Sequence, residues 1–335
     1  MRRGVPVLVL PWVLILAAVS EAGEYKLTLP LGLQEHAAYV PDDNRPTREK
    51  IALGKQLFWD KRWSRNGTVA CVSCHDPTHG WADSRQFSLT FEGKPTARHA
   101  STLVNRLFSD RQHRTGDRAS LEDQAMKARD QSPELLVEHL GAVHAYQAQF
   151  RKVFGTDVNA EGVAQAIADY ERTILSGNSP YDRFRAGDEH ALSPAAQRGL
   201  GHFEGKSHGR GCISCHAGFN FTDEGYHNIG VGMDRENPDL GRYTLTRQEA
   251  DKGAFKTPTL RDVASRPPYM HDGSMKTLEE VVAFYNKGGH GNPWLSPLIR
   301  PLNLTAPEQA DLVAFLEALT GEVAPEVSSP PKLPQ

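Results

Sequence analysis

The sequence predicts a mainly α-helical protein of two similar domains, on the basis of three observations. A Cys-x-x-Cys-His motif occurs twice, at 71–75 and at 212–216, once in each half of the 335-residue chain. A similar apolar segment precedes each motif, at 53–58 and at 198–203. Between and after the motifs, apolar residues recur at helical spacing, and we find no convincing strand pattern.

Both motifs have the form that attaches a c-type haem: two thiols add to the porphyrin vinyl groups, and the adjacent histidine binds the iron. A zinc ribbon needs its second cysteine pair roughly 15–20 residues after the first, whereas these pairs lie in different halves of the chain. A redox dithiol does not need the trailing histidine. Each domain is therefore expected to carry one covalently bound haem, attached through Cys71, Cys74, His75, Cys212, Cys215 and His216.

The N-terminal residues 1–22 have the pattern of a secretory signal peptide. Two arginines precede an apolar run over 7–19, and small residues follow at Ser20 and Ala22. An uncleaved membrane anchor is the alternative. Because c-type haem is attached outside the cytoplasm, we expect a periplasmic protein. The two haem motifs use all four cysteines, so no disulfide framework is expected.

The expected organisation is an N-terminal cytochrome c-like domain at 45–190 and a C-terminal one at 191–322. The last residues, 323–335, are rich in Pro and Ser and are expected to be disordered. The net charge of −3 gives no electrostatic reason to expect nucleic acid as a partner. Helices are predicted over 134–140, 163–175, 277–286 and 306–319.

Five further segments carry a resemblance to a known family: LGKQLFWD (53–60), SLEDQA (120–125), FKTPTLRDV (255–263), PYMHDGS (268–274) and LEEVV (278–282). On these blocks the chain resembles the bacterial dihaem cytochrome c peroxidases, including their MauG-type branch, over nearly all its mature length. The resemblance implies an enzyme that reduces hydrogen peroxide at the N-terminal haem. Electrons would be relayed through the C-terminal haem.

The resemblance also assigns roles around the first haem. His75 matches the proximal ligand of the peroxide-binding iron, and Gln124 and Glu134 match the distal glutamine and the catalytic glutamate. A carboxylate there can carry the proton that peroxide cleavage moves, and an amide can orient the peroxide. A glutamate after Pro133 is also a common first-turn helix residue, favoured by the helix dipole, and this alternative stays open.

The resemblance makes His216 the proximal ligand of the C-terminal haem and places Tyr285 at the sixth-ligand position. Cytochrome c peroxidases have methionine there, and the MauG-type branch has tyrosine. A tyrosine packed on a helix face, or ligation by the nearby Met270 or Met275, is the alternative. Because methionine raises a haem potential and an anionic oxygen lowers it, Tyr285 favours oxidation of another substrate, such as a protein, over peroxide scavenging.

Two departures concern the region between the haems. Arg114 stands where the family has a tryptophan, which puts the family's electron route in doubt. His99 stands at the asparagine of the family's calcium site, whose carbonyl donors match Arg266 and Pro268. Histidine is a poor calcium ligand, which argues against the site. Binding of a calcium ion by the Arg266 and Pro268 carbonyls alone is left open.

A third departure concerns the first haem. Residues 83–94 contain no clear match to the removable histidine ligand of other peroxidases in the family. We therefore expect an open iron that needs no reductive activation, with His79 as a possible substitute ligand.

The sequence thus predicts a periplasmic dihaem peroxidase of the MauG-like branch. Its electrons would come from a small c-type cytochrome, a cupredoxin or a protein substrate, and a homodimer is left open. One alternative is a plain cytochrome c peroxidase that scavenges peroxide. The alternative of another class is a dihaem electron-transfer cytochrome without catalysis.

Overall fold

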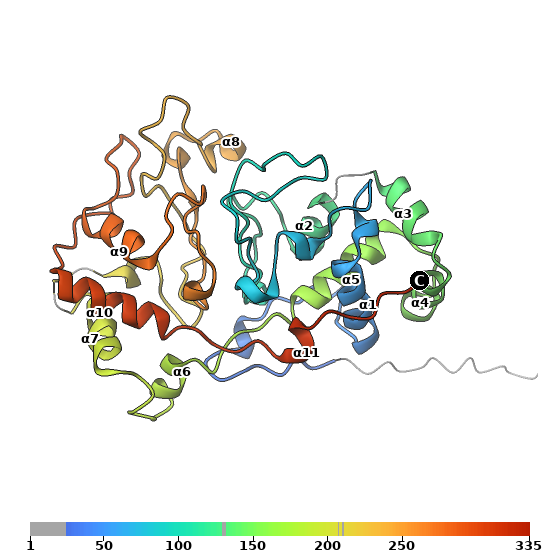
Figure 1. The fold of residues 1–335 in the computed structure, drawn as a ribbon, viewed down its shortest axis with the longest axis horizontal. Coiled ribbons are helices and arrows are strands. Elements are labelled where there is room, and N and C mark those ends of the chain that lie inside the picture. Colours follow the sequence, from blue (N-terminus) through green and yellow to red (C-terminus); the bar gives the residue numbers. More distant parts are fainter. Residues whose placement is uncertain (1–24, 129–131, 207, 210) are drawn as a thin grey trace, which may run out of the picture.

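The computed structural model describes residues 25–128, 132–206, 208–209 and 211–335. Two helical lobes lie side by side in the described chain (Figure 1). The first lobe contains α1 (Arg48–Trp59), α2 (Leu121–Ala128), α3 (Pro133–Gly141), α4 (His144–Phe154) and α5 (Ala160–Glu171). The second contains α7 (Pro194–Phe203), α8 (Tyr243–Thr246), α9 (Leu278–Asn286) and α10 (Ala306–Glu317). The connection between them carries α6 (Pro180–Arg185), and α11 (Pro325–Ser328) leads back towards the first lobe.

The described residues contain a single small sheet, in which β1 (Tyr226–His227) pairs antiparallel with β2 (Phe255–Lys256). Much of the remaining regular structure consists of short 3₁₀ helices, two of which begin the haem motifs. They are η1 (Glu35–Ala37), η2 (Lys61–Trp63), η3 (Cys71–Ser73), η4 (Pro77–His79), η5 (Arg106–Phe108), η6 (Cys212–Ser214), η7 (Glu249–Asp251) and η8 (Val263–Ser265). The predicted mainly α class is confirmed for this part of the chain.

One packing arrangement is repeated in the two lobes. The helix before the first motif, α1, crosses α5 so closely that a Cβ on Gly54 would lie 1.7 Å from the carbonyl oxygen of Ala166. The helix before the second motif, α7, crosses α10 in the same way, and a Cβ on Gly199 would lie 1.9 Å from the carbonyl oxygen of Asp311. The similar segments at 53–58 and 198–203 therefore reflect a helix crossing that only glycine permits.

The predicted helices are present, with small shifts at their ends. α9 begins behind Thr277, whose hydroxyl accepts from the Glu280 amide at 3.2 Å. α5 ends at Glu171, four residues before the predicted end, because the chain turns there and the Ile174 carbonyl accepts from the Asn105 amide at 2.9 Å. A tertiary hydrogen bond thus replaces the predicted last helical turn.

The C-terminal residues 323–335, expected to be disordered, are instead packed on the first lobe. The Val327 carbonyl accepts from the Tyr170 hydroxyl at 2.8 Å, and the Pro334 carbonyl accepts from Arg62 at 2.7 Å. Val323 and Val327 also contact the first core. Polar composition suggested disorder, but two valines and several free backbone carbonyls are enough to hold the tail to the surface of the lobe (Figure 1).

Each lobe has its own hydrophobic core. Buried residues between Leu53 and Ile174 form the first, and buried residues between Leu192 and Leu319 form the second. A third cluster joins Leu107, Phe108 and Leu175 to the segment 27–40. The domain limits at 45–190 and 191–322 stay a prediction, since the N-terminal segment and the tail also contact the lobes.

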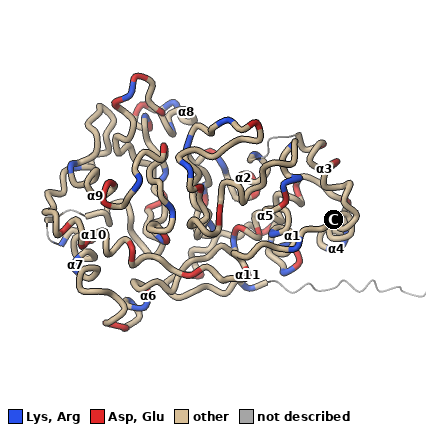
Figure 2. The backbone as a smooth tube through the Cα atoms, viewed as in Figure 1, with Lys and Arg blue, Asp and Glu red and all other residues tan. Residues whose placement is uncertain are grey.

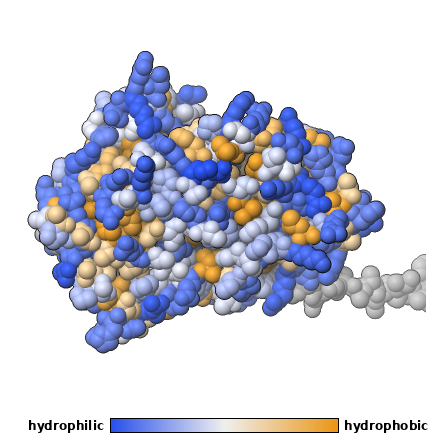
Figure 3. Space-filling model, viewed as in Figure 1, coloured by the Kyte–Doolittle hydropathy of each residue, from blue (hydrophilic) through white to orange (hydrophobic). Residues whose placement is uncertain are grey.

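Charges of both signs are interspersed over the two lobes (Figure 2). The face seen in Figure 3 is mostly hydrophilic, with apolar residues in small separate patches. Among the described residues, no helix combines the length and the apolar character that a membrane span requires. The predicted signal peptide at 1–22 lies outside the described residues.

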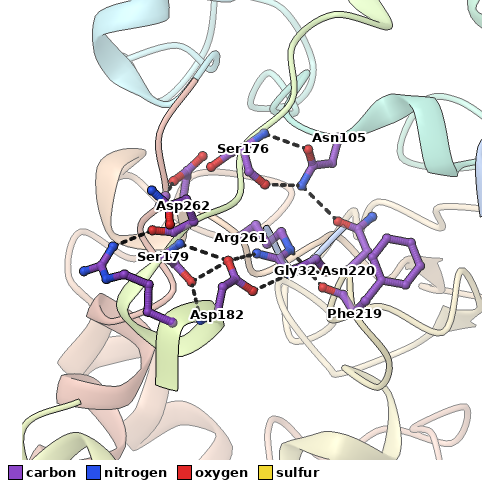
Figure 4. A network of polar contacts seen from close by, with 12 residues as sticks. Gly32, Asn105, Ser176, Ser179, Asp182, Phe219, Asn220, Arg261 and Asp262 are labelled. Atoms are coloured by element: carbon purple, nitrogen blue, oxygen red, sulfur yellow. Dashed lines mark hydrogen bonds and ion pairs between the residues drawn. The ribbon is translucent and has the colours of Figure 1, made fainter. Parts of the chain in front are cut away.

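A buried ion pair connects the elements between the lobes (Figure 4). The Arg261 guanidinium, 1% exposed, donates to both carboxylate oxygens of Asp182 in α6, at 2.8 and 3.0 Å. It also donates to the carbonyls of Gly32 at 3.2 Å and Phe219 at 2.8 Å. Ser179 donates to the same Asp182 carboxylate from its amide and its hydroxyl. One arginine therefore joins the N-terminal segment, the connection and the loop that follows the second haem motif.

We expect Asp182→Ala to destabilise the haem-loaded protein by about 3–5 kcal/mol, because it leaves a buried guanidinium without its counterion. Denaturant unfolding measures the difference. Glu35→Ala is the matched control, since its partner Lys26 is 79% exposed and such surface pairs contribute about 1 kcal/mol or less. Equal losses in the two variants would show that the buried pair stabilises the protein no more than an exposed pair does.

Candidate haem sites

The two haem motifs adopt the same local structure. In the first, the amides of Cys74 and His75 donate to the Cys71 carbonyl at 3.2 and 3.1 Å. In the second, the amides of Cys215 and His216 donate to the Cys212 carbonyl at 3.2 and 2.9 Å. All four cysteines are free thiols of intermediate burial. A tight turn that ends in histidine, with both thiols unpaired, fits covalent attachment of a c-type haem.

Each motif histidine is fixed by a backbone carbonyl. The Nδ1 atom of His75 lies 3.3 Å from the Trp81 carbonyl oxygen, and Nδ1 of His216 lies 3.0 Å from that of Phe221. Both acceptor residues have left-handed backbone, with φ of 58° and 52°. When Nδ1 donates its proton to a carbonyl, Nε2 keeps the lone pair that binds iron. Two non-glycine residues with positive φ at matching places indicate a backbone shaped for this bond.

Burial lowers the pKa of both His75 and His216, since the imidazolium form loses hydration. The Trp81 and Phe221 carbonyls oppose this shift by favouring the ring N–H. Both rings are therefore neutral near pH 7, which is the form that binds a metal. The residues present thus fit a haem in each lobe.

Tyr285, on α9, lies beside the second motif. Burial raises the pKa of its hydroxyl, and the nearby Cys212 and Cys215 sulfurs add to the shift. In the described part of the chain, no hydrogen bond to this hydroxyl is found. The alternative of a tyrosine packed on the helix face stays open. Met270 and Met275 lie instead in the loop closed by the bridge between Tyr269 and Met275.

The two residues assigned to the distal side of the first haem lie on consecutive helices. The Gln124 side-chain oxygen on α2 is buried and has no hydrogen-bond partner in the described residues. Glu134 lies exposed in the first turn of α3, behind the cap formed by Ser132. Residues 129–131, between these helices, lie outside the described chain. The orphaned amide oxygen fits contact with a ligand, and the role of Glu134 stays a prediction.

A second acidic residue near the first motif escaped the sequence analysis. Glu171, at the end of α5, is 6% exposed, and its Oε2 atom has no partner in the described residues. Burial raises its pKa to about 8, against the opposing effect of Arg172. Its charge in turn raises the pKa of the Cys71 thiol, which places it near the first haem. The sequence signal that could have indicated this residue is its place at the end of an apolar helix, directly before Arg172.

Arg114 lies between the lobes. Its Nε donates to the His99 carbonyl at 2.8 Å, and its own carbonyl accepts from the Lys256 amide at 2.8 Å. Burial, together with the nearby cations Arg98 and Arg266, lowers its pKa to about 10. Arg98 has a carboxylate partner in Asp239, at 2.6 Å, so the excess positive charge lies with the other two guanidiniums. Such a site fits a haem propionate.

The same region does not fit the calcium ion that the resemblance implies. The His99 ring is neutral, since burial and Arg114 lower its pKa to about 4, and its Nδ1 lies 3.2 Å from the Arg85 carbonyl oxygen. It offers no oxygen ligand, which calcium requires. The Arg266 side chain is itself buried there and donates to the carbonyls of Arg261 and Thr259. A calcium ion held by the Arg266 and Pro268 carbonyls would lie in a region already rich in positive charge.

His79 was the possible substitute for a removable iron ligand. Its Nε2 atom contacts the Pro267 carbonyl oxygen in the second lobe. The ring therefore has a structural partner, and the expectation of an open first iron remains.

Comparison with known proteins places these features in context. The family model of di-haem cytochrome c peroxidases matches residues 48–190. The cytochrome-c peroxidase IdrP1 of Denitromonas iodatirespirans is 39% identical, over 95% of this chain and 93% of that protein. The methylamine utilization protein MauG of Methylorubrum extorquens is 40% identical, over 88% of this chain and 84% of that protein.

Solved structures show the same relationship. A MauG-like protein associated with microbial copper homeostasis is 30% identical and superposes with a TM-score of 0.83, over 92% of this chain and 99% of that one. The diheme peroxidase BthA of Burkholderia thailandensis, at 22% identity and a TM-score of 0.70, shares the fold.

Proposed function

Since this chain belongs to the di-haem cytochrome c peroxidase family and is an oxidoreductase of that type, we propose that it is a MauG-like peroxidase with Tyr285 bound to the second iron. Hydrogen peroxide is reduced in the first lobe, and the electrons pass through the second. The observation that carries this proposal is the position of Tyr285 on α9, where its hydroxyl lies beside the Cys212 and Cys215 sulfurs. Family membership argues against a pure electron carrier.

Residues of the chain would hold the haems and manage the protons. The haem bound through Cys71, Cys74 and His75 supplies the redox-active iron at which peroxide is reduced. Reduction of one peroxide to two water molecules consumes two electrons and two protons. Gln124 orients the peroxide through its side-chain amide, and Glu134 moves a proton between the two peroxide oxygens. Glu171 is protonated at neutral pH, because its pKa is raised to about 8, and can hold a second proton near the first haem.

The electron source is a small c-type cytochrome, a cupredoxin or an oxidisable protein, and the site of action is the periplasm. The signal-peptide pattern and the two c-type motifs support export. A protein substrate fits Tyr285, because an anionic ligand makes the second haem a poorer electron acceptor and a better store of oxidising equivalents. The runner-up is a plain cytochrome c peroxidase, the activity named for the relative IdrP1. A homodimer stays a prediction.

Tyr285→Met tests the ligand directly. The potential of the second haem should rise, because a neutral thioether replaces an anionic oxygen, and the protein should accept electrons faster from small cytochromes. Potentiometric titration of each haem measures the shift. Tyr39→Met, at a tyrosine that is 45% exposed, is the matched control. If both variants titrate as the native protein does, Tyr285 is not a ligand and the MauG-like proposal fails.

Glu134→Gln should slow the reaction with peroxide by about 10²–10⁴-fold, the usual cost of losing a general acid–base group. Both haem spectra should stay near normal, since the side chain keeps its shape. Rapid mixing of peroxide with the resting protein measures the rate. Glu138→Gln changes an exposed glutamate on the same helix and should react at the native rate. A native rate in the Glu134 variant would remove this residue from the mechanism.

Arg114→Trp should speed electron transfer between the haems. Arginine has no accessible oxidised state, whereas tryptophan can lose an electron and act as a relay. Peroxide is added to the reduced protein, and oxidation of the His216 haem is followed by time-resolved spectra. Arg111→Trp, at an exposed position in the same loop, controls for the added indole. Identical kinetics in native protein and variant would show that Arg114 does not limit transfer, as expected if it only pairs with a propionate.

A further inference from the structure

Three potential metal ligands converge outside the two haem motifs. His202 lies on α7, His208 in the loop that follows it, and Glu308 in the first turn of α10. One ligand atom of each lies within 4.8 Å of the other two. The closest pair is His208 Nε2 and Glu308 Oε1, which are 3.0 Å apart.

The crossing of α7 and α10 accounts for this convergence. The two helices meet where Gly199 lies against the Asp311 carbonyl. His202 is one turn after Gly199, and Glu308 is one turn before Asp311. Because residues three apart lie on the same face of a helix, these two side chains project to the same end of the crossing. The glycine that permits the crossing therefore also brings the two ligands together.

Neighbouring groups orient the carboxylate. The amide and hydroxyl of Thr305 both donate to Glu308 Oε2 at 2.8 Å, as a capping box. Oε1 is left facing His208. The same contacts lower the pKa of Glu308 to about 2, so the group is a carboxylate at neutral pH. Metal ligands are commonly held by such outer hydrogen bonds.

His202 provides an independent observation. Its Nδ1 atom is buried and has no hydrogen-bond partner in the described part of the chain. Its ring stacks on that of His208 at a centroid distance of 6.5 Å. A buried ring nitrogen without a partner is uncommon in folded proteins, and a metal ion bound at the cluster would give this side chain one.

We propose that His202, His208 and Glu308 bind a divalent first-row transition ion of the zinc type, independently of the haems. Two imidazoles and one carboxylate are a ligand set that zinc uses, with a fourth position open to water. Ligand atoms about 2.0–2.1 Å from zinc in a tetrahedral site are roughly 3.3 Å from one another, so small side-chain rotations close the observed cluster. Calcium and magnesium prefer all-oxygen sites and bind here weakly.

The bound ion links the loop before Cys212 to α10. That loop runs from the end of α7 to the second haem motif and includes His208. In the described residues, the one other cluster of metal-binding side chains is Cys215, Asp223 and His227. Haem attachment converts the Cys215 thiol to a thioether, so this second cluster lacks its strongest ligand in the mature protein.

The test uses the full haem-loaded protein after treatment with a chelator. Isothermal titration with Zn²⁺ should give one site per chain, unaffected by millimolar Ca²⁺ or Mg²⁺, and zinc should raise the thermal unfolding temperature. His202→Ala and His208→Ala should each weaken zinc binding at least tenfold and abolish the temperature shift. Glu308→Gln keeps an acceptor for Thr305, so it weakens zinc binding with the helix cap intact.

His227→Ala is the matched control and should bind zinc as the native protein does. Haem content and absorption spectra establish that each variant is folded. If a histidine variant does not fold, zinc binding by Glu308→Gln is the deciding measurement. Native affinity in the Glu308 and His208 variants would overturn the proposal. Loss of zinc binding in His227→Ala instead would also overturn it, by placing the ion at the other cluster.

Discussion

The buried Arg261 guanidinium is the contact on which the arrangement of the second haem site most depends. It holds the Phe219 carbonyl, while Thr259 donates to the carbonyl of the next residue, Asn220, at 2.7 Å. The residue after that is Phe221, whose carbonyl fixes the His216 ring. Asn105 of the first lobe contacts the Asn220 side chain at 3.3 Å. The position of the His216 ring is thereby tied to the ion pair with Asp182 and to the first lobe. Figure 4 shows Arg261 between Asp182 and Phe219, with Asn105 contacting Asn220.

The turns at the two haem motifs could be predicted from the sequence because their hydrogen bonds are local. Cys-x-x-Cys-His needs one short turn, and both motifs form it. The helices were predictable for the same reason, since apolar spacing and caps such as Thr277 act within a few residues. The role of Gly54 and Gly199 was visible only as a weak repeat, because each glycine is needed by a helix more than a hundred positions away in the sequence. Only the structure shows why glycine is needed at these two positions.

The features that sequence reasoning missed all depend on distant partners. Glu171 looks like an ordinary helix residue until its burial and its proximity to Cys71 are known. The tail at 323–335 looks disordered until Tyr170 and Arg62 are seen to hold its carbonyls. The metal-binding cluster combines His202 and His208 with a glutamate from another helix. Burial and long-range contacts decide such cases, and neither can be inferred from local composition.

The two lobes share a scaffold and differ in their unpaired polar groups. In the first lobe, Gln124 and Glu171 each keep a buried oxygen without a partner in the described residues. A buried polar atom normally costs free energy unless a partner is supplied, so this lobe is suited to bind a small polar substrate and to hold a proton. Near the second motif lies the Tyr285 hydroxyl, beside the Cys212 and Cys215 sulfurs, where the proposed function makes it an iron ligand. The same crossing of helices at a glycine thus occurs in both lobes, and in the proposed function these few side chains would separate peroxide reduction from electron storage.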